Sequence, residues 1–311
     1  MLKNVLVTGA SGFIGRHVVR AALTKPGARV RLVHRGPQAF TGERIEAVRA
    51  DLTDPASLTG LCEGIDAVVH CASRVGGTEQ SLHTVNDLGT RALVAEALRC
   101  RVRRVVYVST AAVYGRGPFR GAGPDLQPAP ASATSRTRVA AERHVLAAGG
   151  TVLRPHLVYG TGDRWVLPQL AGLVRLLGAG VACASVHSAV DVGVLAKAAV
   201  TIAVQEGDLP GAFHVNHPRP VPAAALIALV TAHLDLPEAD LLPLERAREL
   251  AGGIPLALHH LEMLGADHWF RSDRIWRELG CDPGQAPADG FAAHLAWYRP
   301  LLRAAARAGG A

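Results

Sequence analysis

The sequence lacks the patterns that mark membrane, secreted and zinc-binding proteins. It has no apolar run of about eighteen residues, and residues 1–8 lack the basic and then apolar pattern of a signal peptide. Its 5 cysteines occur singly, with no CxxC pair, which argues against a disulfide framework and a zinc site. We therefore expect a cytoplasmic protein with reduced cysteines and no membrane partner.

Lysine is scarce, so arginine supplies nearly all of the positive charge. The formal net charge is +7, and the lysines are Lys3, Lys25 and Lys197. The arginines are spread along the chain, and their one cluster, at residues 99–104, is typical of a solvated helix end. Because a basic surface also suits a phosphorylated cofactor, we expect no nucleic-acid partner.

Apolar strands alternate with helical segments over the first half of the chain. A short apolar run at residues 4–8 predicts a buried strand, and helical periodicity at residues 13–23 follows it after a glycine turn. We expect further strands at residues 30–33, 45–49, 67–70, 105–109 and 151–154, and helices at 55–62, 82–100 and 135–148. This order predicts an α/β fold, a Rossmann-type doubly wound parallel sheet.

The second half of the chain is less regular. Residues 115–130 are rich in glycine and proline and predict a loop long enough to border a substrate pocket. We expect residues 1–155 to form the Rossmann domain, with segments of about 181–216 returning to it, and residues 156–311 to form mainly a smaller substrate-binding lobe. The chain is expected to be a monomer or a homodimer.

The turn after the first strand, T-G-A-S-G-F-I-G, predicts a dinucleotide site. Gly9, Gly12 and Gly15 let the backbone turn tightly and approach a pyrophosphate at the N-terminus of the next helix. At the end of the second strand, His34 and Arg35 stand where an NAD enzyme usually has an acidic residue. A guanidinium can bind a 2′-phosphate through two parallel hydrogen bonds. We therefore predict NADPH/NADP+ as the cofactor.

Motifs along nearly the whole chain resemble the extended short-chain dehydrogenase/reductase family, the family of NAD-dependent epimerases and dehydratases. Besides the glycine turn they are Asp51-Leu52, His70-Cys71-Ala72-Ser73, Val85-Asn86 with Gly89-Thr90, V-Y-V-S-T-A-A-V-Y-G at residues 106–115, L-R-P-H-L-V-Y-G at residues 153–160, Arg277-Glu278-Leu279-Gly280 and Ala296-Trp297-Tyr298-Arg299. The resemblance implies an oxidoreductase that converts ketones and alcohols. It also implies a cofactor site made by Gly9, Ser11, Gly12, Phe13, Ile14, Gly15, His34, Arg35, Asp51, Leu52, Cys71, Ala72, Ser73, Asn86, Ser109, Arg138, Pro155 and Leu157.

The helix after the long loop departs from the family at its catalytic positions. The family carries Y-x-x-x-K there, followed by a small-residue pair and glutamate. Aligning Ala140-Ala141-Glu142 with that ending places Thr134 at the tyrosine and Arg138 at the lysine. In the family, the lysine holds the nicotinamide ribose and lowers the pKa of the tyrosine, so that the phenol can protonate the developing alkoxide. A threonine hydroxyl is a far poorer acid.

Two explanations of this departure are open. Either the protein binds the cofactor without turnover, as a regulator, or it reduces a ketone that needs little help with the proton, because hydride transfer chiefly requires a placed nicotinamide and a polarised carbonyl. A ketone flanked by its own phenol or enol hydroxyl supplies that polarisation internally. The chain resembles the atypical ketoreductases that act on tetracyclic angucyclinones, which implies an aromatic polyketide substrate and a role in antibiotic biosynthesis. Nucleotide-sugar epimerisation is disfavoured, because sugar ketones need the absent tyrosine.

We expect Thr110, Thr134 and Arg138 at the catalytic positions. Thr110 aligns with the family's catalytic serine or threonine and could hydrogen-bond the carbonyl oxygen, although a buried threonine paired with backbone fits equally well. Thr134 is either an auxiliary donor or a vestige, and Arg138 either reaches the nicotinamide ribose or points to solvent. A substitute acid could come from one of the segments bordering the pocket, which contain Tyr114, His156, Tyr159 and His187.

A histidine pair near the C-terminus predicts no metal. His259 and His260 with Glu262 supply too few ligands, and nothing nearby in the sequence completes a set. Residues 256–270, with Trp269, form either an apolar wall suited to a flat polycyclic ligand or an ordinary packed helix.

Overall fold

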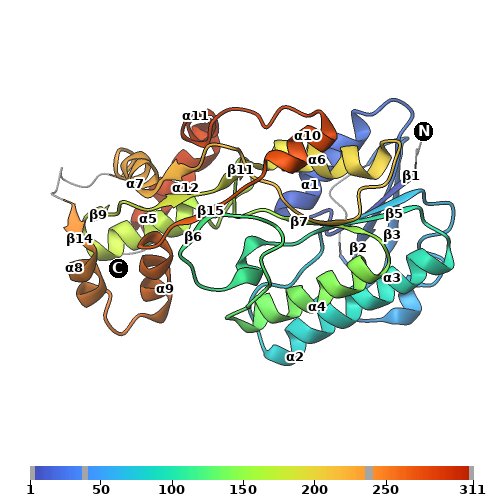
Figure 1. The fold of residues 1–311 in the computed structure, drawn as a ribbon, viewed down its shortest axis with the longest axis horizontal. Coiled ribbons are helices and arrows are strands. Elements are labelled where there is room, and N and C mark those ends of the chain that lie inside the picture. The colour runs from blue at the N-terminus through green and yellow to red at the C-terminus, as the bar shows by residue number, and fades with distance from the viewer. Residues whose placement is uncertain (1–3, 37–40, 235–240, 308–311) are drawn as a thin grey trace.

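The computed structural model describes residues 4–36, 41–234 and 241–307 and contains a seven-stranded sheet. The order of its strands is β12-β7-β5-β4-β1-β2-β3, and every pairing is parallel. The strands are β1 (Asn4–Thr8), β2 (Arg29–His34), β3 (Ile45–Arg49), β4 (Ala67–His70), β5 (Arg104–Val108), β7 (Thr151–Arg154) and β12 (Gly211–His214). The predicted Rossmann fold is therefore confirmed (Figure 1).

Helices cover both faces of this sheet because its strands alternate their side chains. Val5 and Val7 of β1 pack in one cluster with α1 (Phe13–Leu23) and α6 (Val192–Val204). Leu6, between them, faces the opposite cluster, which includes residues of α3 (Gly89–Arg99) and α4 (Ala133–Ala147). The segments between these strands and helices contain four short helical elements. They are η1 (Pro55–Leu58), α2 (Glu79–Leu82), the π-helix η2 (His83–Leu88) and η3 (Ala111–Tyr114).

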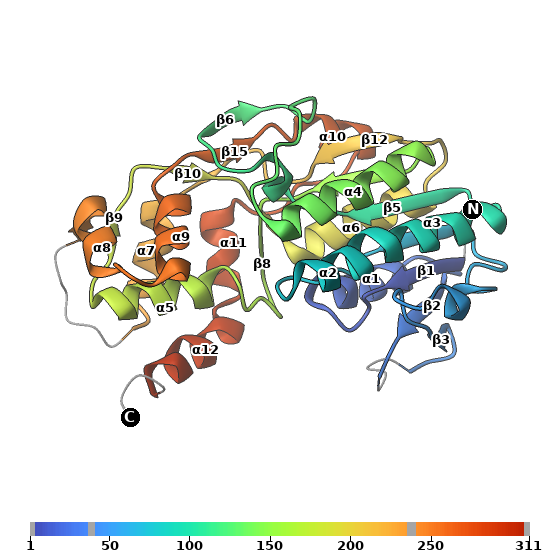
Figure 2. The same cartoon turned by 90° about the horizontal axis from the view of Figure 1, so that it is seen from below.

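A second lobe lies at the far end of the long axis from β1–β3 (Figures 1 and 2). It has its own core cluster, with Leu170, Ile227, Leu261 and Tyr298 among its members. Its helices are α5 (Leu167–Leu177), α7 (Ala223–Thr231), α8 (Leu244–Leu250), α9 (Pro255–Leu264), α11 (Pro287–Ala293) and α12 (Leu295–Arg307). Helix α10 (Asp273–Leu279) instead packs its Ile275 and Trp276 into the Rossmann core.

Short strands lie outside the seven-stranded sheet, and one of them lies in a segment that we expected to be a loop. The expected loop at residues 115–130 contains β6 (Phe119–Ala122), which pairs in parallel with β15 (His268–Phe270). With β10 (Val186–His187) and β13 (Val221–Pro222) they form a four-stranded sheet. Two smaller pairs are β8 (Leu157–Tyr159) with β11 (Ala189–Asp191), and β9 (Val181–Ala182) with β14 (Leu242–Pro243). Within the described ranges no helix has the length and apolarity needed to cross a membrane.

Candidate active site

The glycine turn between β1 and α1 has the geometry that a dinucleotide phosphate requires. Gly9 has φ +67°, and a Cβ there would lie 2.6 Å from the backbone nitrogen of Ala72. A Cβ on Gly15 would collide with the carbonyl oxygen of Gly9. Gly12 caps α1 without a side chain, and the first turn of α1 holds no acidic residue, so its N–H groups and dipole suit an anion. The chain therefore fits a pyrophosphate here.

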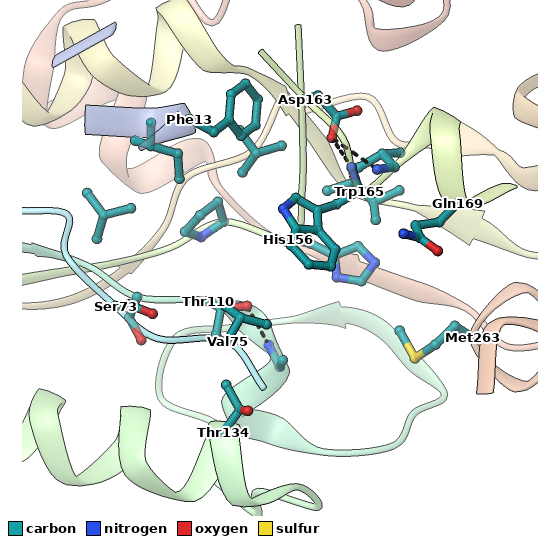
Figure 3. Close-up of a pocket in the computed structure, with 18 of the residues that line it drawn as sticks. Phe13, Ser73, Val75, Thr110, Thr134, His156, Asp163, Trp165, Gln169 and Met263 are labelled. Atoms are coloured by element: carbon teal, nitrogen blue, oxygen red, sulfur yellow. Dashed lines mark hydrogen bonds between the residues drawn. The ribbon is translucent and has the colours of Figure 1, made fainter. Parts of the chain in front are cut away.

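A cavity of about 590 Å³ runs from this turn into the second lobe (Figure 3). Ten of the expected cofactor residues line it: Gly12, Phe13, Ile14, Gly15, Cys71, Ser73, Ser109, Arg138, Pro155 and Leu157. Ser73 Oγ is buried and has no hydrogen-bond partner among the described residues. Such an orphaned polar atom is the kind of group that a bound cofactor would satisfy.

The other expected cofactor residues lie around the cavity rather than in its wall. Gly9 and Ala72 touch at the base of the turn, and the Ser11 carbonyl accepts a 2.9 Å hydrogen bond from Arg16. Asn86 is buried, and its amide bonds to both backbone groups of Arg74, at 2.7 and 3.0 Å. Asn86 therefore positions the loop after β4 and does not reach the cavity.

The edge beyond β2 and β3 holds an exposed cation. The Arg35 side chain is 68% exposed, and its Nη1 lies 3.9 Å from a carboxylate oxygen of Asp51. His34 Nδ1 pairs with the Gly36 carbonyl at 2.5 Å. The backbone N–H of Thr53 hydrogen-bonds Asp51 and lowers the pKa of its carboxyl, which is therefore ionised at neutral pH. Leu52 packs against Gly89. A Cβ added at Gly89 would lie 2.8 Å from the Cβ of Leu52.

A buried relay fixes the loop that carries Cys71 and Ser73. His70 Nδ1 lies 2.6 Å from Thr8 Oγ1, and its Nε2 lies 2.9 Å from Thr90 Oγ1. Thr90 donates its hydroxyl hydrogen to the Asn86 carbonyl, so its oxygen can accept from Nε2–H of His70. Burial lowers the pKa of His70 to about 3. The ring is therefore neutral at physiological pH and serves as a structural link between β1, β4 and α3.

The three expected catalytic residues line one part of the cavity together. Thr110 Oγ1 accepts a 3.1 Å hydrogen bond from the backbone N–H of Ala112, which leaves its own hydrogen available to a ligand. Thr134 lies in the first turn of α4, beside the cavity (Figure 3). The side chains of Thr110 and Thr134 thus both border the cavity.

Arg138 points inward, which excludes the expected alternative of a solvent-facing guanidinium. It is 7% exposed, its Nη2 donates to the Val108 carbonyl at 2.5 Å, and its guanidinium carbon lies 5.0 Å from the centre of the Tyr107 ring. Its Nε is buried with no partner within the described part of the chain. The cation is therefore fixed beside the end of β5.

The candidate substitute tyrosines are turned away from the cavity. The Tyr114 hydroxyl is held by Arg154 at 2.7 Å and His214 at 2.8 Å. The Tyr159 ring stacks on Phe291 at 4.0 Å in the core of the second lobe. Of the described residues that line the cavity, none is a tyrosine or a lysine.

The candidate histidines do line the cavity, but they are poor acids. His156 and His187 stack at 5.8 Å, and His268 stacks on both. Burial lowers the pKa of His156 well below its usual 6.5 and that of His187 to about 4. Both rings are neutral at pH 7 and hold no imidazolium proton to give.

The second lobe gives the cavity an apolar wall. Val166, Leu170, Leu226, Met263 and Leu264 line it, and no arginine or lysine lies on this side among the described lining residues. Sequence patterns did not indicate this wall outside residues 256–270; from that range His260, Met263 and Leu264 line the cavity. Trp269 does not, since its ring packs against Gly121. Glu262 Oε2 lies 3.5 Å from Arg116 Nη1, and Glu262 does not line the cavity.

The sequence matches a known family over more than half of its length. Residues 5–181 match the NAD dependent epimerase/dehydratase family. The chain belongs to this family. Its membership supports an oxidoreductase with a nicotinamide cofactor, and the glycine turn described above fits the pyrophosphate of such a cofactor.

Two curated relatives are reductases by name. The chain is 29% identical to the 2-alkyl-3-oxoalkanoate reductase of Stenotrophomonas maltophilia, over 93% of this chain and 97% of that protein. It is 32% identical to the 4-hydroxy-2-methyl-3-oxo-4-farnesyl-3,4-dihydroquinoline-1-oxide ketoreductase of Stigmatella aurantiaca, over 55% of each chain. The second match spans about half of either protein.

Solved structures share the fold of this family member at low identity. The UDP-glucuronic acid 4-epimerase from Bacillus cereus in complex with NAD superposes with a TM-score of 0.74 at 19% identity, covering 96% of this chain and 99% of that one. The terminal R domain of the myxalamid PKS-NRPS pathway gives 0.76 at 22% identity, with coverages of 96% and 90%. At these identities the likeness establishes the fold alone.

Proposed function

We propose that the protein is an NADPH-dependent ketoreductase whose substrate supplies the proton for its own reduction. The observation that carries this proposal is the composition of the cavity wall. Thr110, Thr134 and Arg138 occupy the wall where the family has its acid, and none of the described lining residues is a tyrosine or a lysine. A substrate that needs a phenolic acid from the protein would be reduced poorly here.

The roles of the side chains follow from their contacts. The bound nicotinamide would supply the hydride to the ketone carbon. Thr110 donates its free hydroxyl hydrogen to the ketone oxygen, and the fixed cation of Arg138 stabilises the negative charge that develops near it. A hydroxyl on the substrate next to the ketone then gives its proton to the alkoxide and regains one from water. The protein thus positions and polarises the ketone without acting as the acid.

The apolar wall supports a flat, uncharged substrate. A nucleotide sugar would need cations near its diphosphate, and the described lining residues of the second lobe include no arginine or lysine. We therefore propose an aromatic polyketide with a hydroxyl beside its ketone. Within this class we propose an angucyclinone, with the C-7 ketone of 7-oxo-simocyclinone as the specific candidate, because the sequence resembles the simocyclinone ketoreductase in lacking the tyrosine. This substrate would place the protein in antibiotic biosynthesis.

The exposed Arg35 supports NADPH over NADH. It stands at the end of β2, where a 2′-phosphate would lie, and it can form two parallel hydrogen bonds to that group. Arg35→Glu should raise KM for NADPH by at least about tenfold and leave KM for NADH nearly unchanged, because only NADPH carries the phosphate. Steady-state kinetics with both cofactors measure this, and an equal rise for both would contradict the assignment.

The proposed activity is tested by NADPH oxidation with three classes of ketone. We expect turnover with 8-hydroxy-1-tetralone, an aryl ketone with an adjacent hydroxyl, and little with a 2-alkyl-3-oxoalkanoate or a UDP-4-ketosugar. Faster turnover of the 3-oxoalkanoate would instead favour a 2-alkyl-3-oxoalkanoate reductase, the activity for which the relative from Stenotrophomonas maltophilia is named. NADPH binding without oxidation by any of the three would favour a cofactor-sensing regulator.

A further inference from the structure

Trp165 is an exposed aromatic residue at the substrate end of the cavity. Its side chain lines the cavity, yet the residue is 61% exposed. Figure 3 shows it on the side of the cavity away from Thr134, with Asp163 next to it. An indole ring that borders a cavity and is largely exposed to solvent has a surface on which a ligand can pack.

The backbone of Trp165 is held rigidly by a buried carboxylate. Asp163 is 0% exposed, and its Oδ1 accepts hydrogen bonds from the backbone N–H groups of Trp165, at 2.6 Å, and Val166, at 3.1 Å. Its Oδ2 accepts from the Tyr298 hydroxyl at 2.9 Å, and its carbonyl accepts from Trp297 Nε1 at 2.9 Å. Helix α12 therefore fixes the loop on which the exposed indole stands.

This arrangement is what a preorganised stacking surface needs. An indole on a fixed backbone loses little conformational entropy when a ring packs on it. The neighbours Val166 and Leu170 also line the cavity and add apolar surface beside the indole. An aliphatic chain would bind through apolar contacts with Val166 and Leu170 alone. A flat ring system also gains binding free energy from offset stacking on an indole.

We propose that Trp165 is the substrate-stacking residue of this site, covering the face of an aromatic ring while Thr110 holds the ketone. This inference rests on the proposed function and deepens it, because it names a flat aromatic ring as the feature that the second lobe recognises. Trp165 would determine which ketones bind and would not take part in proton or hydride transfer.

Binding can be measured apart from turnover. Isothermal titration calorimetry on the NADP+ complex compares 8-hydroxy-1-tetralone with 1-decalone, a saturated bicyclic ketone of the same ring size. Trp165→Ala should weaken binding of the tetralone by about tenfold or more, and Trp165→Phe by no more than about threefold, because phenylalanine retains a ring. Binding of 1-decalone should change less than about threefold in either variant.

Fluorescence supplies a matched control. The tetralone should quench the emission of the wild-type protein and of Trp269→Phe, since Trp269 packs on Gly121 outside the cavity. The quenching should be lost in Trp165→Phe. Unchanged affinity in Trp165→Ala, or unchanged quenching in Trp165→Phe, would overturn the inference.

The outcomes separate this inference from the proposed function. Tetralone binding that depends on Trp165, without NADPH oxidation, would leave the stacking role standing and reject the ketoreductase. Turnover of the tetralone with the same KM in wild type and Trp165→Ala would support the ketoreductase and reject the stacking role. Weakening of both ketones by the same factor would also reject the stacking role, since it indicates a loss of general cavity shape.

Discussion

An arginine and a threonine in α4 change what the cavity can do. Arg138 places a positive charge in the cavity wall, but a guanidinium stays protonated in proteins and cannot pass a proton onward. Its contacts with the Val108 carbonyl and the Tyr107 ring fix it in place. Thr134 offers a hydroxyl but no acid. In the proposed function, the residues of this wall orient and stabilise the reacting ketone, and the substrate supplies the proton.

Gly15 is the residue on which the cofactor turn most depends. Gly15→Ala would place a Cβ against the Gly9 carbonyl and push α1 away from β1. We expect NADPH binding to weaken by at least about tenfold and the protein to lose about 1–3 kcal/mol of stability, as is usual for overpacking. Fluorescence titration of NADPH and urea unfolding measure the two effects.

Gly172 provides the matched control for this change. It lies in α5, and nothing stands within 4 Å of a Cβ added there. Gly172→Ala should bind NADPH normally and gain about 0.5–1 kcal/mol of stability, because alanine is the better helix former. Normal cofactor binding by Gly15→Ala as well would show that the close contact of Gly15 and Gly9 is not required.

At the scale of elements, the alternating order of strands and helices was largely predictable. The strands at residues 4–8, 45–49, 67–70 and 151–154 and the helix at 13–23 are confirmed residue for residue, because each is a local apolar or periodic run. The expected helix at 82–100 is instead α2, η2 and α3 in succession. The π-helical turn lies where Asn86 reaches across to Arg74. That contact is tertiary, so periodicity does not reveal it.

Strand β6 could not be predicted for a similar reason. Its partner is β15, almost 150 residues later in the chain, and Gly121 in β6 accommodates the Trp269 ring. The glycine and proline content of residues 115–130 indicated a loop, which is correct for most of that segment. The exclusion of Tyr114 and Tyr159 from the cavity also depends on long-range contacts, with His214 and Phe291.

Glu96 gives the link between α3 and the turn after η1 a pH dependence. The hydrogen bond from Arg99 is the main cause that lowers the Glu96 pKa to about 2, and the Gly60 backbone also donates to this carboxylate. Because the folded pKa lies below the unfolded value, the stabilisation is present above about pH 4.5 and is lost as pH falls towards 2. Glu96→Gln should cost about 1–3 kcal/mol at pH 7 and much less at pH 2.5.

Urea unfolding of wild type and Glu96→Gln at the two pH values measures this difference. The wild-type protein should lose more stability than the variant between pH 7 and pH 2.5. Equal losses would mean that the carboxylate of Glu96 contributes nothing that depends on its charge.

At the scale of the whole molecule, the C-terminal helix α12 contacts the loop before α5, from which Asp163 and Trp165 line the cavity. Tyr298 donates to Asp163 and accepts a 2.9 Å hydrogen bond from the Gly160 backbone, so it ties α12 to the loop that carries Trp165. The two ends of the cavity are thus built differently. One end is lined by residues of the turns after the strands of the parallel sheet, such as Gly12 and Ser73, and the other end is lined by residues of α5, α7 and α9.

Tyr298→Phe should affect the substrate end alone. The change removes one donor to buried Asp163 and one acceptor for Gly160, which should cost about 1–3 kcal/mol of stability. We expect KM for the ketone to rise severalfold while KM for NADPH stays constant, since the glycine turn is untouched. Thermal unfolding and steady-state kinetics check both parts. A parallel rise in both KM values would contradict the separation of the two ends.

In the proposed reaction the substrate, and not Thr134, supplies the proton. The most direct measurement compares the kcat of wild type and Thr134→Val on 8-hydroxy-1-tetralone and on its methyl ether, 8-methoxy-1-tetralone, with saturating NADPH. We predict that the variant retains at least about a third of the wild-type kcat on the hydroxy ketone, and that both proteins lose about a hundredfold or more on the ether, a typical contribution of a positioned proton donor. An inactive Thr134→Val, or an ether reduced as fast as the hydroxy ketone, would contradict the account.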